Sequence, residues 1–399
     1  MNTELLKSKL LEAAFNGSLT HAARTTWKTA TVGEVASFKY GYTDKARDNG
    51  TARFIRITDI LPDGRLNPND AKFVDMTEEN RDFLLKRGSL LMARTGATFG
   101  KTLYFDECYT AIYASFLIQI SLIAEIYPKF YWYFSQSPQY WNQANTLVNG
   151  GAQPQFNTGA ISKVILSYPP IAEQQRIVAT LEEGFAYIDA IASAKQNLSI
   201  SANLLRSKIL EDAFKGLLTS ADVNKWEIAE LGTACKHQNG DRGKNYPSKK
   251  KLSHCGIPFI SALNLVNNTV IDDDKLLKMS EEQFNKLGNG KLQQGDFVLC
   301  IRGSVGKHGI YPFEKGAIAS SLVILRPVPD KLSLMWLSYY FDSSLFRENL
   351  LEYINGTAQP NLAAKELMKF RIPLPPLAEQ QRIVAKIEEL FTQIDKITK

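Results

Sequence analysis

The sequence predicts an α+β protein in which two β-rich domains are joined by long coiled-coil helices, with an internal duplication of pseudo-two-fold character. Three observations predict this class. A helical segment at the N-terminus recurs in the middle of the chain, and a second helical segment recurs at the C-terminus. The stretches between them carry short β-branched and aromatic runs separated by Gly, Asn, Asp and Pro.

Composition places the chain among ordinary globular proteins. Its 399 residues are 44% hydrophobic and 22% charged, which excludes disorder and collagen and allows two or three domains. A formal charge of +6 is compatible with a polyanionic partner. The sequence shows no signal peptide, no apolar run of about 18 residues and no CxxC pair. We therefore expect a cytoplasmic protein with no membrane contact.

Two blocks of sequence occur twice. Residues 5–20 recur at 204–219 with 11 of 16 positions identical, at an offset of 199. Residues 169–191 recur at 375–397, at an offset of 206. The second copy therefore carries seven more residues between its blocks (206 − 199), and we infer an internal duplication.

The second block has the apolar spacing of a coiled coil. Its C-terminal copy places apolar residues at steps of four and three, at Ile383, Ile387, Leu390, Ile394 and Ile397. The first copy keeps these steps but has a weak point at Gly184. Residues 171–215 join one unit to the next, and as an unbroken helix they would extend about 60 Å. A break is expected near 197–203.

These blocks divide the chain into five segments. They are an N-terminal helix (1–20), a first β-rich domain (21–168), a central helical spacer (169–219), a second β-rich domain (220–374) and a C-terminal helix (375–399). Strands are predicted over 53–60 and 258–265, and over 88–91 and 295–298. The aromatic segments 130–141 and 335–346 are predicted to form short helices facing the core.

Each domain carries a Gly-rich turn with basic ends, 94–101 (RTGATFGK) and 302–307 (RGSVGK). Neither is a P-loop, because the first has three residues between its glycines where four are needed, and no Ser or Thr follows Lys307. We align the two arginines with each other and expect nucleic-acid contact, while a plain solvated hairpin is the alternative. The candidate residues are Arg94, Thr95, Thr98, Lys101, Arg302, Ser304 and Lys307.

A second pair of loops follows the predicted first strand of each domain, at 39–45 and 238–244. Both mix Gly with amide, aromatic and basic residues, a composition suited to base edges and phosphates, although a charged run is often only a solvated surface. The candidate residues are Lys39, Tyr42, Lys45, Asn239, Arg242 and Lys244. The turns at Gln153-Pro154 and Gln359-Pro360 are predicted to be structural.

No catalytic or metal centre is predicted. Cys235, His237, His254 and Cys255 form the only metal-like group, but their spacing is irregular and the first copy has no counterpart, so we expect core or surface residues. No nucleophile–base group, G-x-G-x-x-G motif or [ND]-P-P-[YF] tetrapeptide is present.

Over essentially its whole length, the chain resembles the specificity subunits of type I restriction-modification systems. The resemblance rests on PPIAEQQRIV at 169–178, PPLAEQQRIV at 375–384, the NGxAQP turns at 149–154 and 355–360, and the loops ending in Gly100-Lys101 and Gly306-Lys307. Two such PPxAEQQRIV blocks about 200 residues apart, each closing a divergent domain, are a specific signal.

The resemblance implies two target-recognition domains that each recognise one half of a bipartite site in double-stranded DNA. They would be joined by long antiparallel coiled-coil helices, with the N-terminal helix supplying a segment that the short C-terminal helix lacks. Two methyltransferase (modification) subunits would dock on the helices, and restriction (motor-nuclease) subunits would join them. The partner subunits would bind S-adenosylmethionine for adenine methylation, and ATP and magnesium for cleavage. This chain would bind no cofactor.

Partner docking is predicted around the repeated Gln-Gln-Arg motifs, and a purely intramolecular coiled coil is the alternative. The candidate interface residues are Gln174, Gln175, Arg176, Gln380, Gln381 and Arg382. Two other functions remain open. One is a non-catalytic adaptor that binds proteins through its domains, and the other is a nuclease with degenerate motifs, which would cleave DNA on its own.

Overall fold

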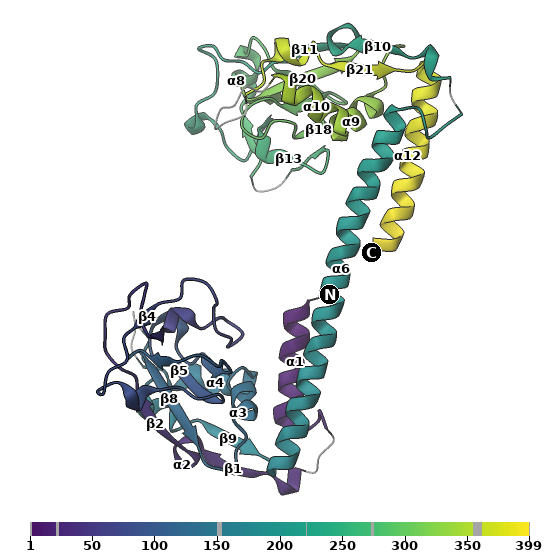
Figure 1. Ribbon diagram of the computed structural model, residues 1–399. Coiled ribbons are helices and arrows are strands. Elements are labelled where there is room, and N and C mark those ends of the chain that lie inside the picture. The colour runs from purple at the N-terminus through teal and green to yellow at the C-terminus, as the bar shows by residue number, and fades with distance from the viewer. Residues whose placement is uncertain are drawn as a thin grey trace. The chain divides into compact units, whose positions relative to one another are not determined.

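The chain forms two compact units in the computed structural model, Met1–Ala194 and Lys195–Lys399. The structure describes residues 2–20, 24–149, 154–220, 222–272, 275–353 and 361–398. Each unit contains a β-rich domain beside a pair of long helices (Figure 1). The boundary lies inside the central helix α6 (Ile171–Phe214), so each unit contains one part of that helix.

Helix α1 (Thr3–Asn16) packs against the first part of α6. It begins where the Asn2 side chain accepts a hydrogen bond from the Leu5 N–H, and it ends at Gly17, whose φ of 84° favours glycine. Its buried side chains join those of α6 and of the β-rich domain in one hydrophobic cluster. The helix is therefore part of unit 1.

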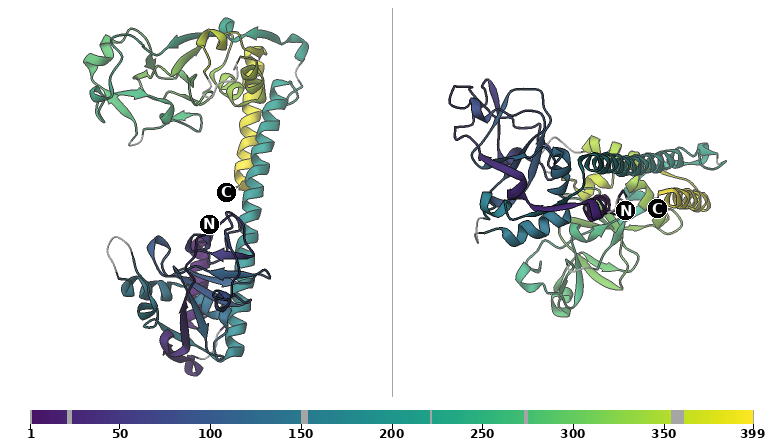
Figure 2. Two further views of the ribbon diagram at one scale, coloured as in Figure 1. Left: turned by 60° about the vertical axis from the view of Figure 1, so that its left-hand side comes forward. Right: turned by 90° about the horizontal axis from the view of Figure 1, so that it is seen from below.

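Both helix pairs are antiparallel. In unit 1, Lys7 forms a 2.6 Å ion pair with Asp189. In unit 2, Arg206 pairs in the same way with Asp395 of α12 (Leu377–Thr398). The two pairs are related by the sequence repeat, because 206 − 7 = 199 and 395 − 189 = 206. Figure 2 shows each helix alongside its part of α6. The structure thus confirms paired antiparallel helices within each unit.

The β-rich domain of unit 1 contains a four-stranded sheet (β2-β8-β5-β6), a three-stranded sheet (β4-β3-β7) and a ribbon (β1-β9). All paired strands are antiparallel except β3 and β7. The strands are β1 (Lys28–Thr31), β2 (Ala36–Tyr40), β3 (Ala52–Ile55), β4 (Phe73–Val74), β5 (Ser89–Ala93), β6 (Thr102–Phe105), β7 (Ala111–Tyr113), β8 (Leu117–Leu122) and β9 (Ile165–Tyr168). The helices are α2 (Val32–Val35), α3 (Pro128–Phe134), α4 (Pro138–Leu147) and α5 (Thr158–Ile161).

Unit 2 repeats this plan with more strands, in a six-stranded sheet (β11-β20-β17-β18-β14-β13), a four-stranded sheet (β15-β12-β19-β16) and a ribbon (β10-β21). The strands are β10 (Glu227–Glu230), β11 (Cys235–Asn239), β12 (Ile257–Ile260), β13 (Leu265–Val266), β14 (Thr269–Val270), β15 (Leu277–Met279), β16 (Lys291–Gln293), β17 (Phe297–Cys300), β18 (His308–Ile310), β19 (Lys315–Ile318), β20 (Leu322–Pro327) and β21 (Arg371–Leu374). The remaining helices are α7 (Leu231–Ala234), α8 (Glu281–Lys286), α9 (Leu334–Asp342), α10 (Ser344–Tyr353) and α11 (Ala364–Leu367).

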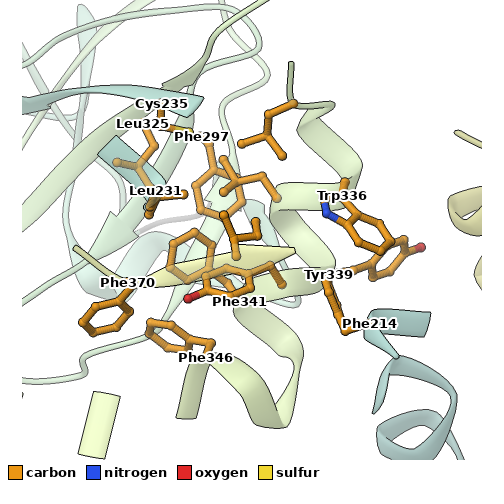
Figure 3. Close-up of a cluster of buried hydrophobic side chains, with 14 of the residues drawn as sticks. Phe214, Leu231, Cys235, Phe297, Leu325, Trp336, Tyr339, Phe341, Phe346 and Phe370 are labelled. Carbon is orange, nitrogen blue, oxygen red and sulfur yellow. The ribbon is translucent and has the colours of Figure 1, made fainter. Parts of the chain in front are cut away.

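The core of unit 2 lies between the sheet, helices α9 and α10, and the end of α6 (Figure 3). Phe214 from the last turn of α6 packs against Trp336 of α9, with ring centroids 4.4 Å apart. Trp336 is fully buried and donates its indole N–H to the carbonyl of Pro373 at 2.9 Å. The aromatic segments therefore form core-facing helices, as the sequence predicts, and they attach each domain to α6.

Two predicted features differ from the structure. Helix α6 continues through 197–203, where the sequence suggested a break. The strands predicted over 53–60 and 258–265 are shorter, because β3 and β12 give way to one-turn 3₁₀ helices. Side chains of Asp59 and Asn264 accept hydrogen bonds from the backbone N–H groups of Arg56 and Ser261, which closes these turns.

No helix within the described ranges is both long enough and apolar enough to cross a bilayer.

Candidate nucleic-acid interface

The Gly-rich turn of unit 1 connects β5 to β6. Gly96 and Gly100 adopt φ values of 72° and 75°, which favour glycine and let the backbone turn sharply. The side chain of Thr95 is buried, while Thr98 and Lys101 are partly exposed. The Thr95 side chain therefore lies inside the turn and not at its surface, and DNA contact by this residue stays a prediction.

The turn of unit 2 connects β17 to β18 and is more open. Arg302, Ser304 and Lys307 are all exposed. Gly303 and Gly306 have positive φ values of 77° and 93°, as their counterparts in unit 1 do. The predicted contact residues of this turn are therefore presented on the surface.

Strand register corrects the predicted alignment of Arg94 with Arg302. The backbone N–H of Arg94 bonds to the carbonyl of Phe116 after β5, and in unit 2 the N–H of Ile301 makes the same bond to Ser321. Arg94 therefore corresponds to the buried Ile301, and Arg302 to Thr95. The sequence alignment was wrong by one residue, because the turn of unit 2 is one residue shorter when counted from the equivalent strand residues Ala93 and Cys300, and not two as the basic ends suggest. The two arginines point to opposite faces of their strands.

The loops predicted at 39–45 and 238–244 begin in the last residues of β2 and β11, and most of their predicted contact residues lie at the surface. In unit 1, the Lys39 ammonium donates to the Asp82 carbonyl at 2.7 Å and lies 4.5 Å from the Phe83 ring. Tyr42 packs on the same ring, and Lys45 is exposed. Lys39 and Tyr42 thus also hold their loop against the domain.

The corresponding loop of unit 2 is organised by Asp241. Its carboxylate accepts hydrogen bonds from the backbone N–H groups of Gly243 and Gly288, which hold the pKa of Asp241 below its usual range. Arg242, which donates to the Ser320 carbonyl at 3.3 Å, and Lys244 are exposed, whereas Asn239 is partly buried.

Arg94 brings the two loops of unit 1 together. Its guanidinium carbon lies 5.1 Å from the Tyr40 ring centroid and 5.4 Å from that of Phe116. Tyr40 ends β2 and Phe116 precedes β8, and both rings are exposed. Sequence reasoning missed both aromatic residues as site candidates, because the strand pairing that places them beside Arg94 is not visible in the sequence.

A cleft opens beside each Gly-rich turn, about 700 Å³ in unit 1 and 520 Å³ in unit 2. Lys101 lines the first and Lys307 the second. Gln136 and Asp342 also line them, and both pairs of residues are related by the offset of 206. The clefts therefore share part of their lining, while residues of α1 and α6 also line the cleft of unit 1. Among the described residues, neither lysine forms an ion pair.

A polar pair lines the cleft of unit 2, the buried His308 and the partly exposed Asp342. The Nδ1 atom of His308 lies 2.9 Å from the Gly306 carbonyl oxygen, and its Nε2 lies 3.6 Å from Asp342. Burial raises the pKa of the Asp342 carboxyl, and the neighbouring His308 opposes that rise. In unit 1, Thr102 takes the place of His308 and donates to the Gly100 carbonyl. In both units, the side chain two residues after the second glycine therefore contacts that glycine's carbonyl oxygen.

The repeated Gln-Gln-Arg motifs begin with a glutamine that is fully buried. Gln174 accepts a hydrogen bond from the Tyr127 N–H and donates to the carbonyls of Glu125 and Pro169, all at 2.8 Å. Gln380 makes the three equivalent bonds in unit 2, to Ser333, Lys331 and Pro375. Both glutamines therefore join the helix to the domain, and their predicted role in partner docking stays a prediction. Gln175, Arg176, Gln381 and Arg382 are exposed and stay candidates.

A second bond strengthens each joint between helix and domain. Thr20, after α1, donates to Glu173, and Thr219, after α6, donates to Glu379. Arg176 pairs with Glu173 at 2.9 Å and donates to the Thr20 carbonyl. The repeated sequence blocks therefore supply the same contacts between helix and domain in each unit.

The described residues contain no group of three or more His, Cys, Asp or Glu side chains arranged to hold a metal ion. Cys235 lies in the core of unit 2, where burial raises its pKa to about 12, so that its thiol stays neutral. Cys255 is exposed. The predicted structural turns at 153–154 and 359–360 fall largely outside the described residues; Pro154, which is described, accepts a hydrogen bond from Gly96.

The structure is therefore a duplicated one, in which two β-rich domains each carry a Gly-rich turn with basic residues and are each attached to an antiparallel helix pair. The chain belongs to the family of the type I restriction modification DNA specificity domain, whose model matches residues 24–199 and 223–399. It is thus a specificity subunit with two copies of that domain.

Curated relatives and solved structures agree with this family. The chain is 21% identical to the EcoBI specificity subunit of Escherichia coli, over 100% of this chain and 86% of that protein. It is 22% identical to the StySPI specificity subunit of Salmonella potsdam, over 94% and 84% of the respective chains.

Two solved structures share the fold. One is a chain from a structural study of complex assembly and conformational transition in the type I R-M system. It matches with a TM-score of 0.71 and 20% identity, over 94% of this chain and 92% of that one. The HsdS subunit of Thermoanaerobacter tengcongensis matches with a TM-score of 0.58 and 21% identity, over 93% and 90%.

Proposed function

We propose that each β-rich domain recognises one half of an asymmetric bipartite DNA site, and that the helix pairs dock two methyltransferase subunits. The observation that carries this proposal is the contrast between constant and divergent parts. The joints at Gln174 and Gln380 are repeated bond for bond, whereas the loops on the domains differ in length, charge and register. A constant frame with divergent loops fits identical partners and two different half-sites.

DNA contact is supported by the two clefts beside the Gly-rich turns. Each presents one lysine beside a glycine turn, where a phosphate can approach the backbone closely. Lys101 and Lys307 would hold the DNA backbone, while the exposed loop residues would contact base edges. Such phosphate contacts position the DNA without selecting a sequence.

Partner docking is supported by an exposed apolar pair that occurs twice. Leu5 and Ile191 lie at one level of the first helix pair, and Leu204 and Ile397 are their repeat equivalents in unit 2. Each of the four side chains is at least half exposed. Two copies of one apolar surface fit two copies of one partner. The exposed residues Gln175, Arg176, Gln381 and Arg382 would border these surfaces.

The chain itself would be non-catalytic and cytoplasmic. S-adenosylmethionine would bind to the methyltransferase subunits, and ATP and magnesium to the restriction subunits. This division of labour is supported by membership of the specificity family, and no catalytic group is assigned to this chain.

The proposal is tested by gel-shift titration of the complex reconstituted with its methyltransferase subunits, repeated across salt concentrations. We expect site-dependent binding, and we expect Lys101→Ala and Lys307→Ala each to reduce the slope of log K against log[salt] by about 1. Both variants should lose affinity by a similar factor on specific and unrelated DNA. Binding with no site preference by the unmodified complex would contradict the proposal and favour a protein-binding adaptor.

A further inference from the structure

The surface around Arg94 is a feature of unit 1 that the duplication does not explain. The Arg94 guanidinium lies between the exposed rings of Tyr40 and Phe116, at 5.1 and 5.4 Å from their centroids. The Tyr40 hydroxyl lies 3.3 Å from the Thr158 hydroxyl at the start of α5, which fixes the orientation of that ring. The two rings thus hold a positively charged, planar group at the surface.

The hydrogen-bonding capacity of Arg94 is largely unused. Among the described residues, no carboxylate forms an ion pair with it, and its Nε atom is buried without a hydrogen-bond partner. A guanidinium has five N–H donors in a fixed plane. Contact with two aromatic rings restrains the side chain and leaves its terminal donors available to a ligand.

Unit 2 has no counterpart of this arrangement. Tyr40 pairs with Ile118 in the sheet, and the corresponding pair in unit 2 is Asn239 with Val323. By the same register, Ser321 replaces Phe116 and the buried Ile301 replaces Arg94. The aromatic clamp, defined as Tyr40, Arg94 and Phe116, therefore belongs to unit 1 alone, and it lies between the two loops predicted to contact DNA.

We propose that Arg94, held by the clamp, makes a bidentate contact with the major-groove edge of a guanine in the half-site that unit 1 recognises. This inference rests on the proposed function of the chain. A restrained planar fork matches the paired O6 and N7 acceptors of guanine, which no other base presents. A phosphate contact needs no such restraint, and the lysine of the neighbouring cleft is suited to that role.

The test uses the complex reconstituted with methyltransferase subunits and a set of duplexes. One duplex carries the site found by sequencing methylated DNA, and each of the others changes one guanine of a half-site. We expect Arg94→Lys to weaken binding to the first duplex by about 10- to 100-fold, because it keeps the charge but loses the fork. The variant should bind one of the altered duplexes with the same affinity as the original duplex, and its salt slope should be unchanged.

Phe116→Leu and Tyr40→Leu should partly lose the same discrimination at the same base pair, because they release the guanidinium. Arg87→Ala is the matched control: this exposed arginine of unit 1 pairs with Asp106, and its removal should leave affinity and discrimination unchanged. Thermal melting and binding of the methyltransferase subunits should match the wild type for every variant.

Three results would overturn the inference. The first is that Arg94→Lys distinguishes the duplexes as well as the wild type does. The second is that Arg94→Ala loses the same affinity on every duplex and lowers the salt slope by about 1, and the third is that discrimination is lost at the half-site of unit 2 instead. If Arg94→Lys does not fold, the surface variant Phe116→Leu decides by the same discrimination measurement. Absence of site preference in the wild-type complex would instead show that the proposed function itself is wrong.

Discussion

At the scale of single residues, Gln174 and Gln380 show how one side chain attaches a helix to a domain. Each amide uses both donors and its acceptor on backbone groups of its own unit, in a fully buried position. The neighbouring glutamines are exposed and make no comparable contact. The motif is therefore conserved between the two copies at least partly for structural reasons.

Gln174→Ala should lower the free energy of unfolding of unit 1 by at least about 2 kcal/mol, because it leaves buried backbone groups without partners at about 1–3 kcal/mol each. Urea denaturation followed by tryptophan fluorescence measures the change. Gln175→Ala, one residue away and exposed, is the control and should change stability by less than about 0.5 kcal/mol. Equal effects of the two substitutions would show that the buried amide does not hold the joint.

Sequence reasoning identified the Gln-Gln-Arg motifs but not which glutamine is buried. The helical repeat alone does not show which face the domain covers, since the covering groups come from residues 125–127 and 331–333. The alignment of Arg94 with Arg302 was wrong for a similar reason. A shift of one residue turns a side chain to the other face of a strand, and only the pairing partners reveal it.

At the scale of elements, Gly184 is where α1 approaches α6. The sequence marked it as a weak point of the heptad pattern, but a Cβ there would lie 3.1 Å from Cδ1 of Leu10. In unit 2 the equivalent residues are Leu390 and Ile209; Ile209 is buried in the core cluster, and Leu390 is partly buried and packs against it. At this position the first helix pair thus packs a glycine against a leucine, and the second pair has a leucine and an isoleucine.

Gly184→Leu should destabilise the first helix pair by about 1–3 kcal/mol, because the new side chain overlaps Leu10. Adding Leu10→Ala should recover most of the loss by making room for it. Thermal melting of the two variants and the wild type measures both effects. If the double variant melts no higher than Gly184→Leu alone, the contact between these residues is not the cause.

The elements that the sequence predicted best are those with repeated, periodic patterns. The helices at both ends, the central helix and the aromatic helices lie where they were expected. The predicted break in α6 is absent, because polar residues at 197–203 are compatible with a helix and Ala202 is buried against the core of unit 2. Short strands were placed less well, since turns closed by Asp59 and Asn264 end them early.

At the scale of the whole molecule, duplication predicts two equivalent docking surfaces. Replacing Leu204 and Ile397 by Asp should remove one of the two methyltransferase subunits, and replacing Leu5 and Ile191 by Asp should remove the other. An aspartate in an apolar contact is costly to desolvate, so each pair of changes should weaken its site by at least about 100-fold. Native mass spectrometry of the assembled complex counts the subunits.

Leu263→Asp provides the control, because this leucine of the unit 2 domain is equally exposed but belongs to the 3₁₀ turn after β12 and not to α6 or α12. It should leave two methyltransferase subunits in place. Loss of both subunits after changing one helix pair, or of neither after changing both, would contradict the assignment of these surfaces.

The central claim is that two domains of one chain recognise two different half-sites. Single-molecule sequencing of DNA methylated by the complex tests it most directly, with the wild-type chain and with Arg302→Ala/Lys307→Ala in unit 2. The account predicts an asymmetric bipartite motif for the wild type, and for the variant a motif degenerate in one half only, with both methyltransferase subunits still bound. A single continuous motif, or degeneracy in both halves, would contradict it.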